Sequence, residues 1–310
     1  MDPFPAIVDC DPGLDDALAL LLVLASPEFE LLGVTTVAGN QTVEKTTTNA
    51  LRVLELASRE DVRVARGADR PLVGELVVAA DAHGDSGLGG LVLPEPKSEP
   101  ANEHAVDFLA ERLLGADRPI TLFALGPLTN VALLLALHPE VTRGIDRIVL
   151  MGGAIGEGNM TASAEFNIWI DPEAAASVFE SGLDVTMVGL DVTNRALLMP
   201  EDAKRLRGGG AVGAAAAAML DFYLGFYEAA YEHGGAPIHD AVAVAHALRP
   251  GVVTTLARRV DIALEGLCRG RTVVDMRRRT TLPEPNAHVA VDIDVDAFRD
   301  LLLERLASLG

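Results

Sequence analysis

The sequence predicts an α/β fold, with a mainly parallel open sheet, helices on both faces and a small C-terminal antiparallel addition. The chain has 310 residues, of which 49% are hydrophobic, so it can enclose a large core. Short apolar runs alternate with longer helical segments. These runs lack the strict alternation of half-exposed strands, which indicates burial on both faces. The expected strands are residues 6–10, 30–37, 120–125, 145–151 and 185–190.

Helical patterns fill most of the intervals between these strands. We expect helices at residues 15–25, 43–57, 103–114, 128–137, 172–181 and 201–206, and two longer helices at 211–233 and 238–249. Residues 257–293 are predicted to form antiparallel strands with turns, followed by a final helix at 295–309. Because no linker or shift in composition divides the chain, we expect a single domain over residues 1–310.

The charge balance restricts the possible partners. The chain carries 45 acidic and 25 basic residues, which gives a net charge of −20. Such a surface repels nucleic acid and anionic membranes. The longest apolar runs, near 17–25 and 211–220, are too short to span a bilayer. Cys10 and Cys268 lack CxxC or metal-binding spacing and no signal peptide is visible, so we expect a cytoplasmic protein.

A dense group of acids follows the first expected strand. Asp9, Asp11, Asp15 and Asp16 surround a Pro-Gly turn that leads into the first expected helix. One or two acids there could serve merely as helix caps or partners of the helix dipole. Four like charges need a counter-charge, which a hard divalent cation with oxygen ligands would supply. The sequence therefore predicts a catalytic metal site at the mouth of the sheet.

Polar residues also follow the other expected strands, where parallel sheets bind their ligands. Asp11, Asp16 and Asp240, with the backbone carbonyl of Leu125, form a candidate ligand set for Ca²⁺, an ion that takes about six to eight oxygens. His239 is a candidate for proton transfer. Four further side chains could bind the vicinal hydroxyls of a polyol: Asp15, Asn40, Glu165 and Asn167.

Several of these residues also have a purely structural interpretation. Asn40 follows a glycine, as turn residues often do. Phe166 fits the packing of a core. His239 and Asp240 begin an expected helix and could be a capping pair.

The motifs and their order resemble those of the inosine-uridine-preferring nucleoside hydrolase family. Seven motifs in one order are far more specific than a single DxD, and the resemblance extends from about residue 5 to 305. The motifs are DCDPGLDD at 9–16, VAGN at 37–40, HGDSGLG at 83–89, GPLTN at 126–130, MGG at 151–153, EFN at 165–167 and IHD at 238–240.

The resemblance implies calcium-dependent hydrolysis of the N-glycosidic bond of a ribonucleoside, of the inosine/uridine or pyrimidine type, to ribose and a free base. Asp11 would be a metal ligand and the general base, and His239 would protonate the leaving base. Asp16, Asp240 and the Leu125 carbonyl would complete the protein ligands of Ca²⁺. The resemblance also implies a homodimer or homotetramer. Residues expected to bind the substrate are Asp15, Asn40, His83, Met151, Asn159, Glu165, Phe166 and Asn167.

The base preference stays open at this point. Tyr223, Phe226, Tyr227 and Tyr231 could each stack on the base, and the sequence does not rank them. His83 and His239 together favour inosine/uridine or pyrimidine substrates over strictly purine ones.

Two other functions fit part of the pattern. A haloacid-dehalogenase-type phosphatase also begins with DxD after a strand, but the turn that follows usually differs from PGLDD. No well-placed downstream lysine is evident for it. A non-catalytic ribonucleoside-binding protein would need the polyol pocket, but it would not need Asp11 as a base.

Overall fold

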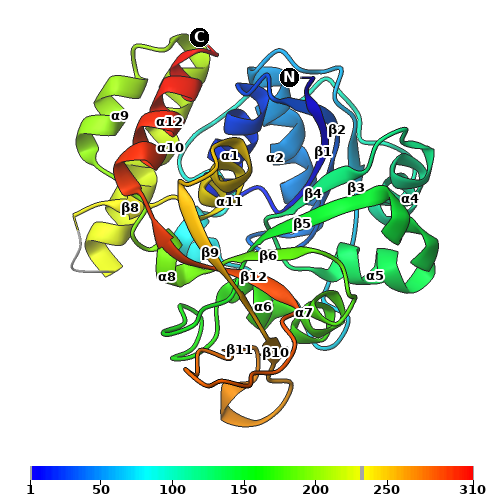
Figure 1. Cartoon of the computed structure of the whole chain (residues 1–310). Helices are drawn as coiled ribbons and strands as arrows, with labels where there is room; N and C mark the ends of the chain where they lie inside the picture. The colour runs from blue at the N-terminus through cyan, green and yellow to red at the C-terminus, as the bar shows by residue number, and fades with distance from the viewer. Residues whose placement is uncertain (1, 231–233, 310) are drawn as a thin grey trace.

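An eight-stranded sheet forms the centre of the computed structural model, which describes residues 2–230 and 234–309 (Figure 1). The strand order is β3-β2-β1-β4-β5-β6-β12-β9. Neighbouring strands run parallel except at one edge, where β9 is antiparallel to β12. The strands are β1 (Phe4–Cys10), β2 (Phe29–Thr36), β3 (Val64–Arg66), β4 (Ile120–Ala124), β5 (Ile145–Met151), β6 (Val185–Val188), β9 (Val253–Arg258) and β12 (Ala287–Ile293).

Helices cover both faces of this sheet, as the sequence predicts (Figure 1). One face carries α1 (Leu14–Leu24), α2 (Val43–Leu56), α9 (Pro200–Leu206), α10 (Gly210–Ala230), α11 (His239–Leu248) and α12 (Val295–Ala307). The other face carries α4 (Ala105–Gly115), α5 (Thr129–Leu137), the 3₁₀ helix η1 (Pro139–Gly144) and α7 (Pro172–Phe179).

Successive side chains of the central strands enter the two opposite cores. In β1, Val8 packs on the α1 side and Ile7 on the α4 side. In β4, Phe123 packs on the α1 side and Leu122 on the α4 side. All four are fully buried, so these strands have no polar face. This explains why their sequences are continuous apolar runs.

The order of the strands places a crevice between β1 and β4. From β1 the chain moves outward through β2 and β3, and it then returns to β4 and continues to β5 and β6. Doubly wound sheets bind ligands beyond the carboxyl ends of the strands at such a switch point. Asp11 directly follows β1 and Leu125 directly follows β4, so both border this crevice.

The C-terminal part contains the expected antiparallel strands, and one of them also joins the main sheet. β12 pairs in parallel with β6 and therefore extends the main sheet. Its residues Val289 and Ala290 enter the two opposite cores, so the strand is buried on both faces. Among the described residues, the part of this region that forms a separate antiparallel sheet is β10 (Val260–Ile262) with β11 (Thr272–Val274), beside the 3₁₀ helix η2 (Gly266–Cys268).

Several short elements are absent from the sequence-based expectations. The expected strand at 185–190 ends at Val188, because Gly189 is the extended N-cap of a short helix, α8. Elements of two to five residues contain too few positions to show a hydrophobic period. Those that the sequence does not predict are β3 (Val64–Arg66), α3 (Ala80–His83), α6 (Phe166–Ile170), α8 (Leu190–Thr193), β7 (Leu197–Leu198) and β8 (Ala236–Pro237).

Helix α10 is longer than the apolar run at 211–220 suggests. By length and composition it could cross a membrane, and it is the one helix of the described residues that meets this test. Half of its most apolar window is buried inside the protein, where α10 packs against α9 and α12. A core helix passes the same test, so this helix alone is a weak indication of a membrane span.

Candidate active site

Hydrogen bonds to Asp16 shape the acidic turn between β1 and α1. The backbone N–H groups of Asp11 and Gly13 donate to the Asp16 carboxylate at 3.1 and 3.0 Å. The side-chain amide of Asn40, from the loop after β2, donates to the same carboxylate at 2.9 Å. Asp16 lies in the first turn of α1, where the helix dipole also favours a negative charge. The turn is thereby fixed around the acids.

Two glycines make room for the carboxylate of Asp11. A Cβ atom at Gly39 or at Gly126 would collide with this carboxylate. The backbone N–H of Asn40 donates to Oδ2 of Asp11 at 2.6 Å. Oδ1 is buried and has no hydrogen-bond partner among the described residues. A buried carboxylate oxygen without a protein donor is suited to bind a cation or a water molecule.

Three other carboxylates meet beside Asp11. One oxygen of each of Asp15, Asp16 and Asp240 lies within 4.8 Å of the other two. Burial and then the charge of Asp16 raise the pKa of Asp15 to about 8. Burial, followed by the charges of neighbouring aspartates, also raises the pKa of Asp11 and Asp240 well above the usual value. The four groups therefore oppose one another's ionisation unless a cation compensates their charge.

Asp240 reaches this cluster from a distant part of the chain. The short strands β7 and β8 pair, and the N–H of Ile238 donates to the carbonyl of Ala196 at 3.1 Å. His239 and Asp240 then begin α11, which packs against α1. The structure thus brings the three predicted carboxylate ligands to one site. The tightest group contains Asp15, which the sequence assigns to the sugar, and Asp11 borders that group.

The atoms around the cluster fit a hard divalent cation. The candidate donors are all oxygens: the carboxylates and the carbonyl of Leu125, which lines the pocket. The side-chain amide of Asn167 donates to this carbonyl at 2.8 Å. A carbonyl oxygen has two lone pairs, so it can accept that bond and also bind a cation. Among the described residues that line the pocket there is no Lys or Arg, so the protein offers the carboxylates no positive side chain there.

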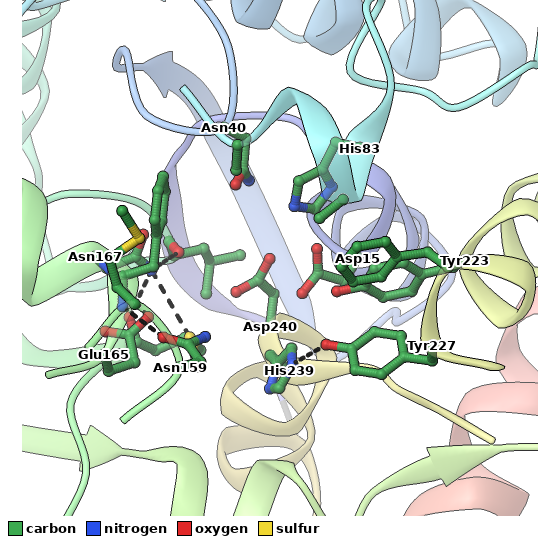
Figure 2. A pocket seen from close by; sticks show the side chains of 17 residues that line it. Asp15, Asn40, His83, Asn159, Glu165, Asn167, Tyr223, Tyr227, His239 and Asp240 are labelled. Carbon is green, nitrogen blue, oxygen red and sulfur yellow. Dashed lines mark hydrogen bonds between the residues drawn. The ribbon is translucent and has the colours of Figure 1, made fainter. Parts of the chain in front are cut away.

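One side of the pocket is formed by polar side chains that are held by the backbone (Figure 2). Glu165 caps α6, and its carboxylate accepts hydrogen bonds from the N–H groups of Gly153 and Asn167 at 2.8 and 2.9 Å. Asn167 in turn donates to the carbonyls of Leu125 and Met151. Burial raises the pKa of Glu165 to about 7, although the backbone N–H groups oppose this rise. We call this the sugar side, because the resemblance described above assigns these residues to the ribose.

Asn159 and Phe166 complete the sugar side. The side-chain oxygen of Asn159 accepts a hydrogen bond from the N–H of Phe166 at 2.9 Å. Asn159 is exposed and Phe166 is half-buried, and both line the pocket. Phe166 is therefore a pocket residue as well as a packing residue.

The opposite side of the pocket is formed by aromatic rings and histidines (Figure 2). We call it the base side, because the sequence suggests that these rings stack on the base. Tyr223 packs against His83 with ring centroids 5.8 Å apart and against Tyr227 at 5.0 Å. Phe226 contacts Tyr227 at 5.3 Å. The three aromatic residues belong to α10 and line the pocket. The fourth candidate, Tyr231, lies outside the described residues.

The two pocket histidines are uncharged near neutral pH. Burial lowers the pKa of His83 to about 4, and burial together with the nearby His83 lowers that of His239 to about 3. The N–H of Leu14 donates to Nδ1 of His83 at 3.1 Å, so the proton of this neutral ring is on Nε2. A neutral histidine still carries one N–H donor.

Sequence reasoning misses Thr193, which contacts His239. Oγ1 of Thr193 lies 2.8 Å from Nδ1 of His239, and the hydroxyl of Tyr227 lies 3.1 Å from Nε2. Thr193 belongs to the four-residue helix α8, and no motif or period in the sequence marks it.

Comparison with known proteins identifies the class of enzyme that has this arrangement. Residues 6–300 match the family described as inosine-uridine preferring nucleoside hydrolase. The chain belongs to this family and is a nucleoside hydrolase, an N-glycosidase. The resemblance inferred from the seven motifs is confirmed, and neither the phosphatase nor the non-catalytic alternative accounts for this match.

Individual relatives are similar over nearly the whole chain. A pyrimidine-specific ribonucleoside hydrolase RihA of Klebsiella pneumoniae (strain 342) is 49% identical over 306 residues, which cover 98% of each chain. RihA of Escherichia coli O9:H4 (strain HS) is also 49% identical, over 97% of this chain and 98% of the relative. The structure of a purine-preferring ribonucleoside hydrolase from Gardnerella vaginalis superposes with a TM-score of 0.93, at 38% identity and 98% coverage of both chains. These similarities confirm the predicted fold class.

Proposed function

We propose that the protein hydrolyses pyrimidine ribonucleosides to ribose and a free base, with Ca²⁺ bound at the acidic cluster. The division of the pocket carries this proposal: hydroxyl-binding groups form one side, aromatic rings form the other, and the carboxylates lie between them (Figure 2). The 49% identity to relatives named as pyrimidine-specific supports the class of base. Inosine is the second candidate, which the family description supports.

Asp11 acts as the general base that takes a proton from the attacking water. Oδ1 of Asp11 is buried and accepts no hydrogen bond from the described residues, so it can accept this proton. The N–H of Asn40 holds the other oxygen and thereby fixes the orientation of the carboxylate. Burial raises the proton affinity of Asp11, as is required of a base that works near neutral pH.

The sugar side positions the ribose while C1′ develops positive charge. We assign contacts with the ribose hydroxyls to the polar side chains and contact with the ring to Met151. Hydrolysis of a glycosidic bond passes through an oxocarbenium-like state, which nearby carboxylates stabilise. The residues that hold the hydroxyls are Asp15, Asn40, Asn159, Glu165 and Asn167.

His239 assists the leaving base as a neutral hydrogen-bond donor. The sequence suggests that His239 protonates the leaving base, and its low pKa favours a role through a neutral N–H donor. Nε2 lies 3.1 Å from the hydroxyl of Tyr227, which lines the base side. A donor network of His239 and Tyr227 can stabilise negative charge that develops on the base as the bond breaks. The released base then takes up a proton from solvent, which balances the proton that Asp11 took from the water and later releases. Tyr223 and His83 pack around the base.

Four protein groups would hold Ca²⁺: the carboxylates of Asp11, Asp16 and Asp240 and the carbonyl of Leu125. The position of Asp15 in the same carboxylate group adds a fifth candidate oxygen donor. When bound, such a cation lowers the pKa of a water molecule and binds sugar hydroxyls. The choice of Ca²⁺ is supported by a donor set made only of oxygens.

The substrate proposal is tested with a panel of ribonucleosides. We expect uridine and cytidine to release reducing sugar with a higher kcat/KM than inosine, and to release uracil and cytosine. Deoxyuridine should react poorly, because the sugar side has fewer hydroxyls to hold. A strict preference for inosine would contradict the base assignment, and the absence of sugar release from every nucleoside would contradict the activity.

We further propose that two or more copies of this chain associate through the β10–β11 region. Within residues 258–282, five large apolar side chains are exposed to solvent, and the side chain of Leu267 is fully exposed. Seven arginines and three acids in the same range give a charge of +4, whereas the rest of the chain carries 18 basic and 42 acidic residues, or −24. The region therefore complements the acidic surface of a second copy. The apolar residues are Leu264, Leu267, Val273, Met276 and Leu282.

Light scattering after size-exclusion chromatography tests this association. We expect a dimer or tetramer, and Leu267→Lys should shift it toward the monomer. A wild-type monomer would contradict the proposal. The single domain over residues 1–310 and the cytoplasmic location stay predictions.

A further inference from the structure

We propose that the short helix α8 positions both sides of the active site: Thr193 fixes the imidazole of His239, and Asp191 fixes the loop that carries Asn159. The two residues are two positions apart on the same helix, and they contact groups on opposite sides of the pocket. This inference rests on the proposed role of His239 at the leaving base. Neither residue lines the pocket, so both act through other groups.

Thr193 determines which nitrogen of His239 carries the proton. Thr193 is fully buried, and Nδ1 of His239 is the one hydrogen-bond partner of its hydroxyl among the described residues. A buried hydroxyl that does not donate its hydrogen is costly. Thr193 therefore donates to Nδ1, and the proton of the neutral ring is on Nε2.

This tautomer directs the hydrogen bonds toward the base. Nε2–H of His239 donates to the hydroxyl oxygen of Tyr227, across 3.1 Å. His239 thereby offers an N–H donor on the side of its ring that faces Tyr227 and the base side of the pocket. In the opposite tautomer, Nε2 would carry no hydrogen, and His239 could only accept a hydrogen bond there. The orientation set by Thr193 thus decides whether the donor network can stabilise the leaving group.

Asp191 performs the corresponding task on the sugar side. Its carboxylate accepts hydrogen bonds from the N–H groups of Ile155 and Gly156, at 2.6 and 3.1 Å. These residues begin the loop in which Asn159 binds the N–H of Phe166. The loop has no regular secondary structure, so these side-chain contacts replace a backbone ladder. Loss of Asp191 should loosen the loop and weaken binding of the ribose.

Two substrates separate these roles: uridine, whose base needs stabilisation on leaving, and p-nitrophenyl riboside, whose leaving group is a stable anion. Thr193→Val keeps the buried shape and removes the hydroxyl. We expect it to lower kcat on uridine by about tenfold more than kcat on p-nitrophenyl riboside, the effect of losing roughly one hydrogen bond. Thr193→Ser restores the hydroxyl and should recover most of the loss.

Asp191→Ala should give the complementary pattern. We expect KM to rise by about tenfold on both substrates, the effect of roughly one hydrogen bond to a charged group. The ratio of the kcat values on the two substrates should be unchanged.

Thr47→Val is the matched control for Thr193→Val. Thr47 is a buried threonine of α2 whose hydroxyl bonds to Val43 and Thr36, and its loss should leave the ratio of the two substrates unchanged.

His239→Ala distinguishes failure of this inference from failure of the proposed function. If His239→Ala lowers kcat on both substrates by the same factor, the proposed role of His239 is wrong. If His239→Ala lowers kcat on uridine more than kcat on p-nitrophenyl riboside, but Thr193→Val lowers both by the same factor, the positioning role of Thr193 is wrong. Should Thr193→Val not fold, ¹⁵N NMR of the wild-type ring decides: a proton on Nδ1 of His239 contradicts the inference, and a proton on Nε2 supports it.

Discussion

The sugar side and the base side of the pocket differ in what holds their functional groups. On the sugar side, carboxylates and amides bind backbone atoms: Glu165 accepts from Gly153 and Asn167, and Asn167 donates to two carbonyls at strand ends. On the base side, side chains contact one another. Tyr223 packs against His83, and Tyr227 binds His239.

This difference has a consequence for specificity. Backbone positions change little when a side chain is substituted, so the sugar side is tied to the sheet and should recognise ribose in any nucleoside. The base side is built from side chains of α3, α10 and α11, which can repack individually. Base preference can therefore change without loss of ribose binding. The relatives fit this division, since one is named as pyrimidine-specific and another as purine-preferring.

The largest expected effect comes from the carboxylates between the two sides. Asp11→Asn removes the proposed base and should lower kcat by about 10²–10⁴-fold on every nucleoside. The fold should persist, because the substitution also removes a buried like charge. Steady-state kinetics and circular dichroism provide the check. Asp9→Asn is the control, since Asp9 is equally buried but binds Thr35 and Asn130, away from the pocket. Comparable losses in both variants would refute the assignment of Asp11.

A change on the sugar side should affect all nucleosides equally. Glu165→Gln places an amide nitrogen against backbone N–H groups that now donate to a carboxylate. We expect kcat/KM to fall by about 10–100-fold, the equivalent of one hydrogen bond to a charged group. The fall should be the same for uridine, cytidine and inosine. A loss confined to one base would show that the two sides are not independent.

A change on the base side should be smaller and should depend on the base. Tyr227→Phe keeps the ring and removes the hydroxyl that binds His239. The loss of one neutral hydrogen bond should lower kcat on uridine by about fivefold. KM should change little, because the ribose contacts remain. An increase in KM of similar size for every nucleoside would place Tyr227 on the sugar side instead.

The sequence predicts the parts of this site that are local. Asp11, Asp15 and Asp16 are found from sequence because a strand, a turn and a helix follow one another within a few residues. Asp240 is found from its motif alone. The pairing of β7 with β8 brings it to the site from a distant part of the chain, and local sequence cannot show that pairing. Thr193 could not be predicted, because its contact with His239 depends on the packing of side chains 46 positions apart.

The same distinction applies to the fold. The buried parallel strands β1, β4 and β5 appear in the sequence as apolar runs with helices between them. The position of β12 in the sheet cannot be predicted from the sequence, because an apolar run looks the same whether the neighbouring strand is parallel or antiparallel. Its neighbour β6 lies about a hundred residues earlier, and the pairing of His288 with Thr186 is decided by the two cores.

The most direct test is to measure sugar release from uridine before and after the protein is stripped of metal with EDTA and refilled with Ca²⁺ alone. We predict that turnover disappears on stripping and returns when about one equivalent of Ca²⁺ has bound, and that Asp240→Asn weakens this recovery. Undiminished turnover by protein that elemental analysis shows to be free of metal would contradict the account.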